Sequence, residues 1–164
     1  MNEIPFFATT SAFAMRVGQL ATSLYDGMDA CLAAHGIELP GYTTSIVQTL
    51  YHGGPQSISD LAQELKLSHQ LASQRVNWLV RAGFVTSASH ADDRRVRVVR
   101  LSRAGRVQAT KLQEFLPLLA EAYGDLFEEI GVDLHDATLR ASAALEARSL
   151  ADRVAVPVNG SRPR

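Results

Sequence analysis

The sequence predicts a mainly α-helical chain that carries one small β-hairpin. Apolar residues recur every three or four positions over most of its 164 residues, which is the pattern of helices with one buried side. One stretch differs, because a polar turn at residues 90–93 is followed by valines that alternate with arginines. Hydrophobic residues make up 46% of the chain, which is enough to fill a core and excludes a disordered protein.

The N-terminal part is expected to form two helices. The first covers about residues 9–34 and ends at Gly36, since glycine commonly follows the last turn of a helix. Thr43 or Thr44 is the expected cap of the second helix, which the run of glycine and proline at residues 53–55 closes. The buried side of this second helix is expected to hold Ile46, Val47, Leu50 and Tyr51.

Two short helices are predicted next, joined by a tight turn. Ser57 or Ser59 is the candidate N-cap of the first, which ends near Leu65. Ser68 is the candidate N-cap of the second, which runs over residues 69–81.

A basic hairpin follows these helices. Gly83 stops the preceding helix, residues 84–85 begin a strand, and residues 96–101 form the return strand. Two short helices followed by a hairpin form the layout of a winged helix-turn-helix, a module that reads DNA.

Two further helices are predicted after the hairpin. Ser102 is a candidate cap for a long helix over residues 103–130, and a last helix is expected over residues 134–154. The residues expected to face inward on the last helix are Leu139, Ala143, Leu145 and Leu150.

The net charge of −1 conceals a strong asymmetry along the chain. Residues 66–111 contain ten Lys and Arg against two Asp, a local net charge of +8, whereas the remainder has a net charge of −9. A basic half attracts phosphate, and an acidic half stays away from DNA. The alternative is a bipolar surface with no partner.

The predicted helix over residues 69–81 presents two unlike sides. Ala72, Val76 and Leu79 fall on one stripe and are expected to face the core. The other side carries groups that form hydrogen bonds with base edges, among which glutamine and asparagine suit adenine. The alternative is an ordinary solvated face. The candidates for major-groove contact are Ser68, His69, Gln70, Ser73, Gln74, Arg75 and Asn77.

The hairpin supplies a second set of candidate DNA contacts. Arg94 and Arg95 are expected to enter a narrow minor groove, where negative potential is focused, and Arg97 adds to the basic field. Asp93 is expected to pair with a nearby arginine such as Arg95 and to fix the shape of the hairpin. Arg100 and Arg103 are expected to be solvated.

These motifs together resemble the MarR family of regulators. The resemblance rests on Leu61–Leu65, Ser68–Leu79, Gly83–Val85, Asp93–Arg95 and Leu101–Gly105, and by motif it covers about residues 42–111. It implies a dimeric repressor that pairs through its first and last helices and binds a pseudo-palindromic operator. It also implies release by a small aromatic effector or by cysteine oxidation.

The chain departs from the family pattern in the second short helix. His69 and Gln74 stand where basic residues are common, Arg75 where an apolar residue is usual, and Trp78 where a polar or basic one is usual. Recognition is therefore expected to lean on the hairpin and on Arg75. Trp78 is expected to pack on an adjacent helix, with the lining of a cavity as the alternative.

Dimerisation is also expected from apolar residues in the terminal helices, which exceed what a thin winged domain covers. The expected segments are an N-terminal dimerisation helix at residues 1–36, a DNA-binding domain at 42–102, C-terminal dimerisation helices at 103–156 and a flexible tail at 157–164.

An effector pocket is expected where the first helix, the second helix and the winged domain meet, because an aromatic acid needs an apolar cleft with a few polar groups. The alternative is that these aromatic residues belong to the core. The candidates are Tyr25, Met28, His35, Tyr42, Tyr51 and His52. Cys31 is expected to be a structural thiol rather than a redox sensor, since no neighbouring Lys or Arg lowers its pKa.

Catalysis is not expected. The five histidines show no metal-ligand spacing, and the chain has neither a glycine-rich phosphate loop nor a nucleophile elbow, so no cofactor and no metal are predicted. The sequence shows no signal peptide and no membrane-spanning run, which favours a cytoplasmic protein. A protein–protein adaptor and a non-specific architectural DNA binder remain as alternative functions.

Overall fold

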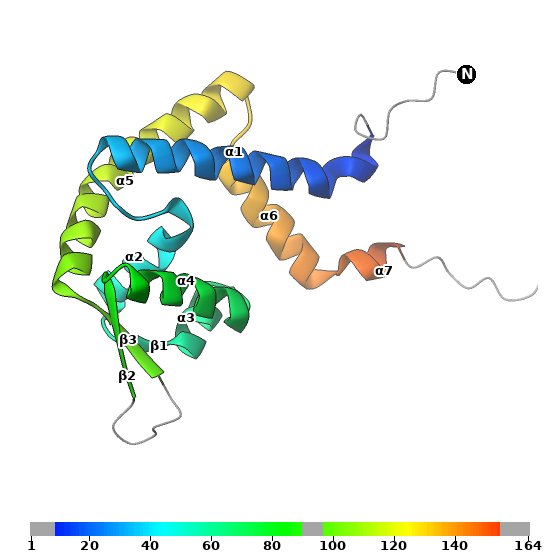
Figure 1. The fold of residues 1–164 in the computed structure, drawn as a ribbon. Helices are drawn as coiled ribbons and strands as arrows, with labels where there is room; N and C mark the ends of the chain where they lie inside the picture. Colours follow the sequence, from blue (N-terminus) through cyan, green and yellow to red (C-terminus); the bar gives the residue numbers. More distant parts are fainter. Residues whose placement is uncertain (1–8, 90–96, 155–164) are drawn as a thin grey trace, which may run out of the picture. The chain divides into compact units, whose positions relative to one another are not determined.

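The computed structural model describes residues 9–89 and 97–154 of the chain. The chain divides into two compact units, Met1–Pro117 and Leu118–Arg164. Within the described residues the chain is mainly helical and has one small antiparallel sheet, so the predicted fold class is confirmed (Figure 1).

The first unit contains the two predicted short helices and the hairpin in the expected order. The bounds of its elements are η2 Thr10–Ala12, α1 Phe13–Ala34, η3 Gly41–Thr43, α2 Thr44–Gly53, β1 Gln56–Ser57, α3 Ile58–Glu64, α4 His69–Arg81, β2 Val85–Ser89, β3 Arg97–Leu101 and the first part of α5, which as a whole runs over Arg103–Ile130.

The sheet has a third strand that the sequence did not predict. The strand order is β1-β3-β2, and all neighbours are antiparallel. Val85 pairs with Leu101 at one end of the hairpin, and Gln56 of β1 pairs with Val99 on the other side of β3. A strand of two residues cannot show an alternating pattern, and only its pairing with β3 defines it.

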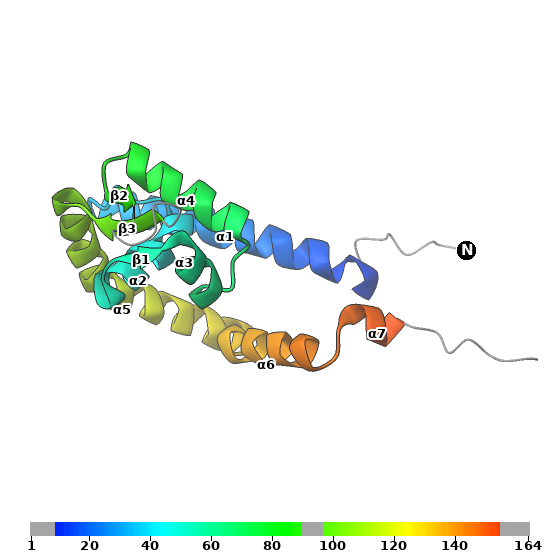
Figure 2. The ribbon, with the colours of Figure 1, turned by 90° about the horizontal axis from the view of Figure 1, so that it is seen from below.

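A single core holds the first unit together. Figures 1 and 2 show α3 and α4 side by side next to the sheet, and each helix contributes to the buried apolar layer. Burial of each such side chain contributes roughly 1.5–3 kcal/mol. The largest fully buried side chains include Leu32, Ile46, Val47, Leu61, Leu79 and Leu112.

Serine hydroxyl groups begin three of the helices, as predicted. Ser57 accepts a hydrogen bond from the Asp60 amide, and the Asp60 carboxylate accepts one from the Ser57 amide, which completes a capping box. Ser68 caps α4 by accepting from the Leu71 amide, and Ser102 caps α5 in the same way.

The predicted cap of α2 is confirmed in its position but not in its hydrogen bond. Thr43 is the N-cap residue but makes no side-chain cap bond. Its hydroxyl donates to the Pro40 carbonyl at 2.7 Å, and the Thr44 hydroxyl donates to the Gly41 carbonyl at 2.7 Å. The 3-10 turn η3 leads directly into α2. Both threonine hydroxyl groups donate to carbonyls at the start of this turn, and neither accepts a bond from a helix amide.

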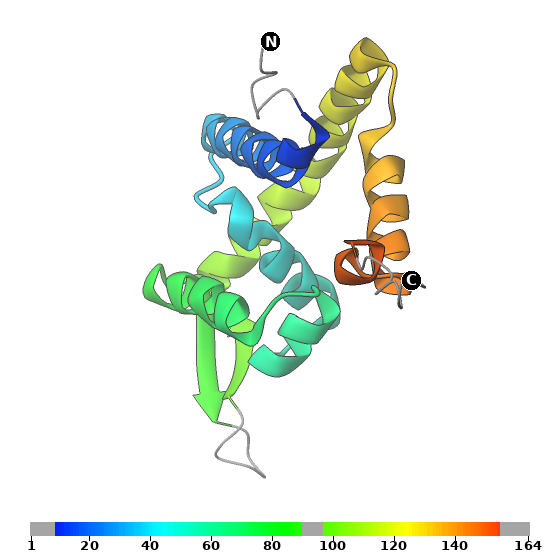
Figure 3. The ribbon, with the colours of Figure 1, turned by 90° about the vertical axis from the view of Figure 1, so that its right-hand side faces the viewer.

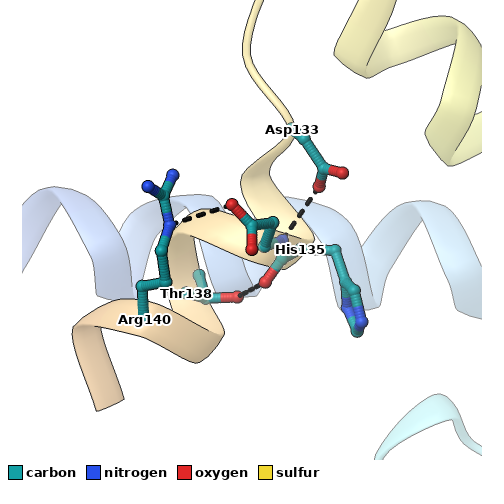
Figure 4. A network of polar contacts seen from close by, with 5 residues as sticks. Asp133, His135, Thr138 and Arg140 are labelled. Carbon is teal, nitrogen blue, oxygen red and sulfur yellow. Dashed lines mark hydrogen bonds and ion pairs between the residues drawn. The ribbon is translucent and has the colours of Figure 1, made fainter. Parts of the chain in front are cut away.

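The second unit continues α5 and then forms α6 (Leu134–Ala147) and α7 (Leu150–Val154). Asp133 caps α6 by accepting from the Asp136 amide at 2.9 Å, and Asp136 pairs with Arg140 (Figure 4). The one last helix predicted over residues 134–154 is therefore two helices, and the break between them is visible in Figure 3.

Local hydrogen bonds explain this break. Arg148 has extended dihedral angles of φ −146° and ψ 112°, and Ser149 begins a new capping box with Asp152. The Arg153 side chain donates to the Ala144 carbonyl at 2.7 Å and so satisfies the end of α6. Leu139, Ala143, Leu145 and Leu150, expected to face inward, are all exposed on this chain.

Gly105 of α5 leaves the least room for a side chain among the glycines of the described residues. A Cβ atom built there would lie 1.9 Å from the carbonyl oxygen of Phe84, which is far inside van der Waals contact. We expect Gly105→Ala to lower the free energy of unfolding by about 1–3 kcal/mol, because the backbone must shift.

Gly124→Ala is the matched control for Gly105→Ala. Gly124 lies on the same helix and has no atom within 4 Å of its built Cβ, so alanine there should stabilise α5 by up to about 1 kcal/mol. Urea unfolding of both variants measures the difference. Equal stabilities for the two variants would contradict the close approach at Gly105.

Candidate nucleic-acid interface

Helix α4 is fixed in the first unit by one apolar side. Ala72, Val76 and Leu79 are at most 1% exposed and lie in the core. Because these residues follow the helical repeat, the opposite side of α4 must face outward.

The outward side of α4 carries polar residues with four- and three-residue spacing. Gln70, Gln74, Asn77 and Arg81 are all exposed and form one continuous face, which we call the polar face of α4. Arg81 adds a cation to this face. The helical repeat that it shares with Gln70, Gln74 and Asn77 places it on the outward side of α4 from the sequence alone.

The other sequence candidates on α4 are placed less uniformly. Ser68 and His69 are exposed at the N-terminal end of the helix, and the Ser68 hydroxyl is engaged as the cap. Ser73 and Arg75 are only half-exposed. The structure therefore brings most, though not all, of the predicted major-groove residues onto one surface.

Arg75 turns toward an aromatic ring instead of bulk solvent. Its guanidinium carbon lies 5.9 Å from the centroid of the Tyr42 ring, within the range of a cation–π contact. Its Nε atom is buried and has no hydrogen-bond partner in the part of the chain that the structure describes. A buried donor without a partner costs about 1–3 kcal/mol.

An open groove lies beside the polar face of α4. Its volume is about 320 Å³, and we call it the Arg75 groove. Trp78 lines it while packing against Phe84 and Tyr42 at ring-centroid distances of 6.3 and 6.5 Å. Both interpretations of Trp78 therefore apply, since it packs and also lines a groove. The lining residues are Tyr42, Leu71, Gln74, Arg75, Trp78 and Arg81.

Two arginines of β3 donate hydrogen bonds to hydroxyl groups of the facing strand β2. Arg97 donates through Nε to Ser87 Oγ at 3.2 Å, and Arg100 donates through Nε to Thr86 Oγ1 at 3.3 Å. Each hydrogen bond restrains a long side chain while other guanidinium N–H groups remain available. Arg100, expected to be simply solvated, is exposed but restrained.

Three predicted residues of the hairpin lie outside the described residues. These are Asp93, Arg94 and Arg95. Their predicted roles remain predictions.

A junction of short contacts joins α4, the hairpin and α5. The Ser102 hydroxyl donates to the Gly83 carbonyl at 2.6 Å and accepts from the Gly105 amide at 3.0 Å. The Ser102 amide donates to the Phe84 carbonyl at 2.9 Å. One serine therefore ties the C-terminal end of α4 to the end of β3 and to the start of α5.

The six predicted effector residues do not converge on one pocket. Tyr25 and Met28 lie against Gly41, where a built Cβ would be 3.3 and 3.1 Å from them. Tyr42 alone lines the Arg75 groove. Tyr25 and Met28 of α1 therefore lie near η3, the 3-10 turn that also contains Tyr42, but they do not line the Arg75 groove.

The remaining three candidates lie elsewhere in the first unit. His35 packs against the Phe115 ring at a centroid distance of 5.0 Å, and its Nδ1 contacts the Cys31 carbonyl. Tyr51 and His52 pack edge to face, and His52 Nε2 lies 3.1 Å from Gln113 Nε2 of α5.

Cys31 was expected to be a structural thiol, but it is exposed. The neighbouring Leu32 takes the buried position at this end of α1. Among the described residues, no three His, Cys, Asp or Glu side chains are grouped to hold a metal ion. No helix within residues 9–89 and 97–154 has the length and apolar character needed to cross a membrane.

The stability cost of Arg75 can be measured directly. We expect Arg75→Met to raise the free energy of unfolding by about 1 kcal/mol, because the loss of an unpaired buried donor outweighs the loss of the cation–π contact. Urea unfolding measures this difference. Arg106→Met at an exposed site of α5 is the control, with an expected change within about 0.5 kcal/mol. A loss of stability in Arg75→Met alone would contradict the expected cost of Arg75.

Part of the chain matches a known protein family. Residues 35–96 match the model of the MarR family. No curated protein sequence matches the chain.

Solved structures share the fold at low sequence identity. The heme sensor protein PefR from Streptococcus agalactiae, in complex with heme, is 21% identical over 87% of this chain and 97% of its own, with a TM-score of 0.57. A probable transcriptional regulator from Pseudomonas aeruginosa is 22% identical over 78% of this chain and 94% of its own, with a TM-score of 0.55. The MepR–DNA complex of S. aureus is 16% identical over 87% of this chain and 99% of its own, with a TM-score of 0.63.

The predicted resemblance is confirmed: the chain is a winged helix-turn-helix protein, and its residues 35–96 carry the sequence pattern of the MarR family.

Proposed function

We propose that this chain is a sequence-specific transcription regulator, a cytoplasmic homodimeric repressor that responds to a small-molecule effector. The observation that carries the proposal is the polar face of α4, which stands opposite a side fixed in the core and beside a basic hairpin. The match to the MarR family and the likeness to the DNA complex of MepR support it.

The polar face of α4 suits the major groove of B-DNA. An α-helix fits that groove, and glutamine or asparagine side chains pair with adenine through two hydrogen bonds. Gln70, Gln74 and Asn77 are exposed for such contacts, and Arg81 reaches a guanine edge or a phosphate. His69 and Ser68, at the N-terminal end of the helix, lie where a phosphate is favoured.

The hairpin is proposed to contact the flanking minor groove and the backbone. Arg97 and Arg100 are restrained by hydroxyl groups and add positive charge beside α4. Arg94 and Arg95 are proposed to enter the minor groove, with Asp93 pairing an arginine, as the sequence predicts.

A second copy of the chain is proposed to cover exposed apolar residues of the terminal helices. Large exposed patches of this kind mark protein interfaces, and a two-fold axis would place two copies of α4 about 34 Å apart. The exposed fractions are 65% for Phe13, 45% for Val17 and 43% for Leu20 on α1, and 58% for Leu139 and 49% for Leu145 on α6.

The Arg75 groove is the proposed effector site. Two aromatic rings, Leu71 and two guanidinium groups suit a planar ligand with a carboxylate. Of the six residues first predicted for the effector, only Tyr42 remains in this proposal.

DNA-binding measurements distinguish the proposed regulator from two alternatives, a protein–protein adaptor and a non-specific architectural DNA binder. The polar face of α4 has a single arginine, which gives some support to a protein–protein adaptor. The basic hairpin argues against an adaptor. A non-specific architectural protein would bind DNA without a preferred site.

Selection of genomic fragments with the purified protein tests the proposed function. It is carried out at about 0.15 M salt, where non-specific binding is weak, and the bound DNA is sequenced. Recovery of an inverted repeat with half-sites about one helical turn apart supports a dimeric regulator. Bound DNA without a motif would favour the architectural function, and no bound DNA would favour the adaptor.

Replacement of a hairpin arginine should weaken DNA binding without changing sequence preference. We expect Arg95→Ala to lower operator affinity and to reduce the slope of log affinity against log salt by roughly one unit, because one phosphate contact is lost. Arg140→Ala, on α6 and paired there with Asp136, is the control and should change neither quantity. An unchanged slope in Arg95→Ala would remove that residue from the interface.

Replacement of a residue on the polar face should instead change sequence preference. We expect Gln74→Ala to lose about 1–3 kcal/mol of discrimination at one base position while retaining most of its affinity for random DNA. Gln19→Ala on α1 serves as the control. Equal losses on operator and random DNA would argue against base reading by Gln74.

A further inference from the structure

We propose that the hairpin straddles the minor groove beside each half-site, with its two described arginines on different DNA strands. Arg97 contacts the backbone nearer α4, and Arg100 contacts the backbone on the far side of the groove. The inference rests on the proposed function and assigns each arginine its own partner. It also makes the Thr86 hydroxyl the group that positions Arg100.

The two arginines lie on opposite faces of the hairpin. Successive side chains of a strand point to opposite faces of the sheet, so Arg97 shares a face with Val99, and Arg100 lies on the other face. The hydrogen bonds keep each side chain on its own face. Ser87, opposite Val99 in the pairing, binds Arg97, and Thr86, opposite Arg100, binds Arg100.

The face that carries Arg97 is the one that packs on the core. Val85, Val99 and Leu101 on this face are at most 6% exposed, and α4 contributes to the same core. Figures 1 and 3 show the ends of β2 and β3 projecting beyond α4, and Arg97 at that end of β3 is exposed. Arg97 is therefore free to bind DNA on the side of the hairpin where α4 lies.

The face that carries Arg100 is open and has no acidic side chain. Thr86, Ala88 and Arg100 are exposed there, so the described residues leave this face uncovered, and the two small side chains permit close approach of a backbone. Residues 97–113 contain five Arg and Lys and no Asp or Glu. Within the described ranges Arg100 forms no ion pair. An unpaired guanidinium group in a basic segment attracts phosphate.

The hydroxyl groups of β2 hold each arginine ready for a phosphate. Nε of Arg100 lies 3.3 Å from Thr86 Oγ1, and Nε of Arg97 lies 3.2 Å from Ser87 Oγ. The terminal nitrogens of each guanidinium group stay available for a charge-assisted pair with phosphate oxygens. An arginine that is already restrained loses less rotamer freedom on binding. The same arrangement on both faces indicates two separate anion contacts.

The dimensions of B-DNA suit a hairpin with one arginine on each face. The minor groove is about 6 Å wide, so both of its backbones lie close to an inserted hairpin. Arg97 and Arg100 are three residues apart, roughly 10 Å along the strand. Two restrained side chains that leave opposite faces at this separation reach the two backbones rather than one.

Neutral phosphates test this assignment. A methylphosphonate replaces one phosphate at a time, at the same position in both half-sites of the operator recovered by selection, on either side of the flanking minor groove. On the far strand we expect one position that weakens the parent chain and Arg97→Gln about 3- to 10-fold but leaves Arg100→Gln unchanged, because one exposed charge contact per copy is already lost. On the strand nearer α4 the two variants should exchange behaviour.

Two results would overturn the inference. One is a single phosphate whose neutralisation cancels the effect of both arginines, since both would then bind one strand. The other is an Arg100→Gln variant that binds the operator as tightly as the parent chain, or whose loss is the same at every phosphate position. Arg106→Gln, which removes the same charge from an exposed site of α5, is the control and should bind as the parent chain does.

Valine and serine at position 86 test the positioning role of the hydroxyl group. We expect Thr86→Val, which keeps the β-branched shape, to lower operator affinity about 2- to 10-fold, because Arg100 must then be immobilised on binding. Thr86→Ser keeps the hydroxyl group and should retain the affinity. In the Arg100→Gln background, Thr86→Val should have no effect, and an equal loss in both backgrounds would contradict positioning. Failure of the parent chain to bind any DNA would instead refute the proposed function itself.

Discussion

The contact between Gly105 and the Phe84 carbonyl constrains the rest of the DNA-reading surface. Only a residue without a side chain allows α5 to begin so close to the end of α4, since a Cβ there would lie 1.9 Å from that oxygen. Ser102 then bridges the Gly83 carbonyl and the Gly105 amide, and β3 ends at the same place. Because α4, the hairpin and α5 meet at this junction, the polar face of α4 and the arginines of β3 are held in fixed positions relative to each other.

The same surface carries one of the buried side-chain polar atoms that have no hydrogen-bond partner among the described residues; Gln48 Nε2 and Gln56 Oε1 are others. Arg75 is half-buried beside Tyr42 with an unpaired Nε, although an apolar side chain at this position would suit the fold better. A cost of this kind is common where a residue serves binding. The Nε atom has no accessible surface, so a ligand in the Arg75 groove would reach this side chain only through its terminal guanidinium nitrogens.

Features that depend on neighbours along the chain were predictable from the sequence. The caps at Ser57, Ser68 and Ser102 are such features, because each serine bonds an amide three residues later. The break at Ser149 has the same signature, a serine followed three residues later by Asp152. The apolar pattern around it predicts one continuous helix instead. Strand β1 and the Arg75 groove could not be predicted from the sequence, because both depend on contacts between residues distant along the chain. The contact of Tyr42 with Arg75 is an example.

The central claim is that α4 lies in the major groove of two half-sites. Affinity cleavage tests it most directly, because the single cysteine can be moved by combining Cys31→Ser with Ala82→Cys and attaching an iron chelate at position 82, the exposed C-terminal end of α4. The account predicts two groups of cuts on the selected operator, separated by about one helical turn. Cuts spread evenly along the fragment, or no cuts while the protein remains bound, would contradict it.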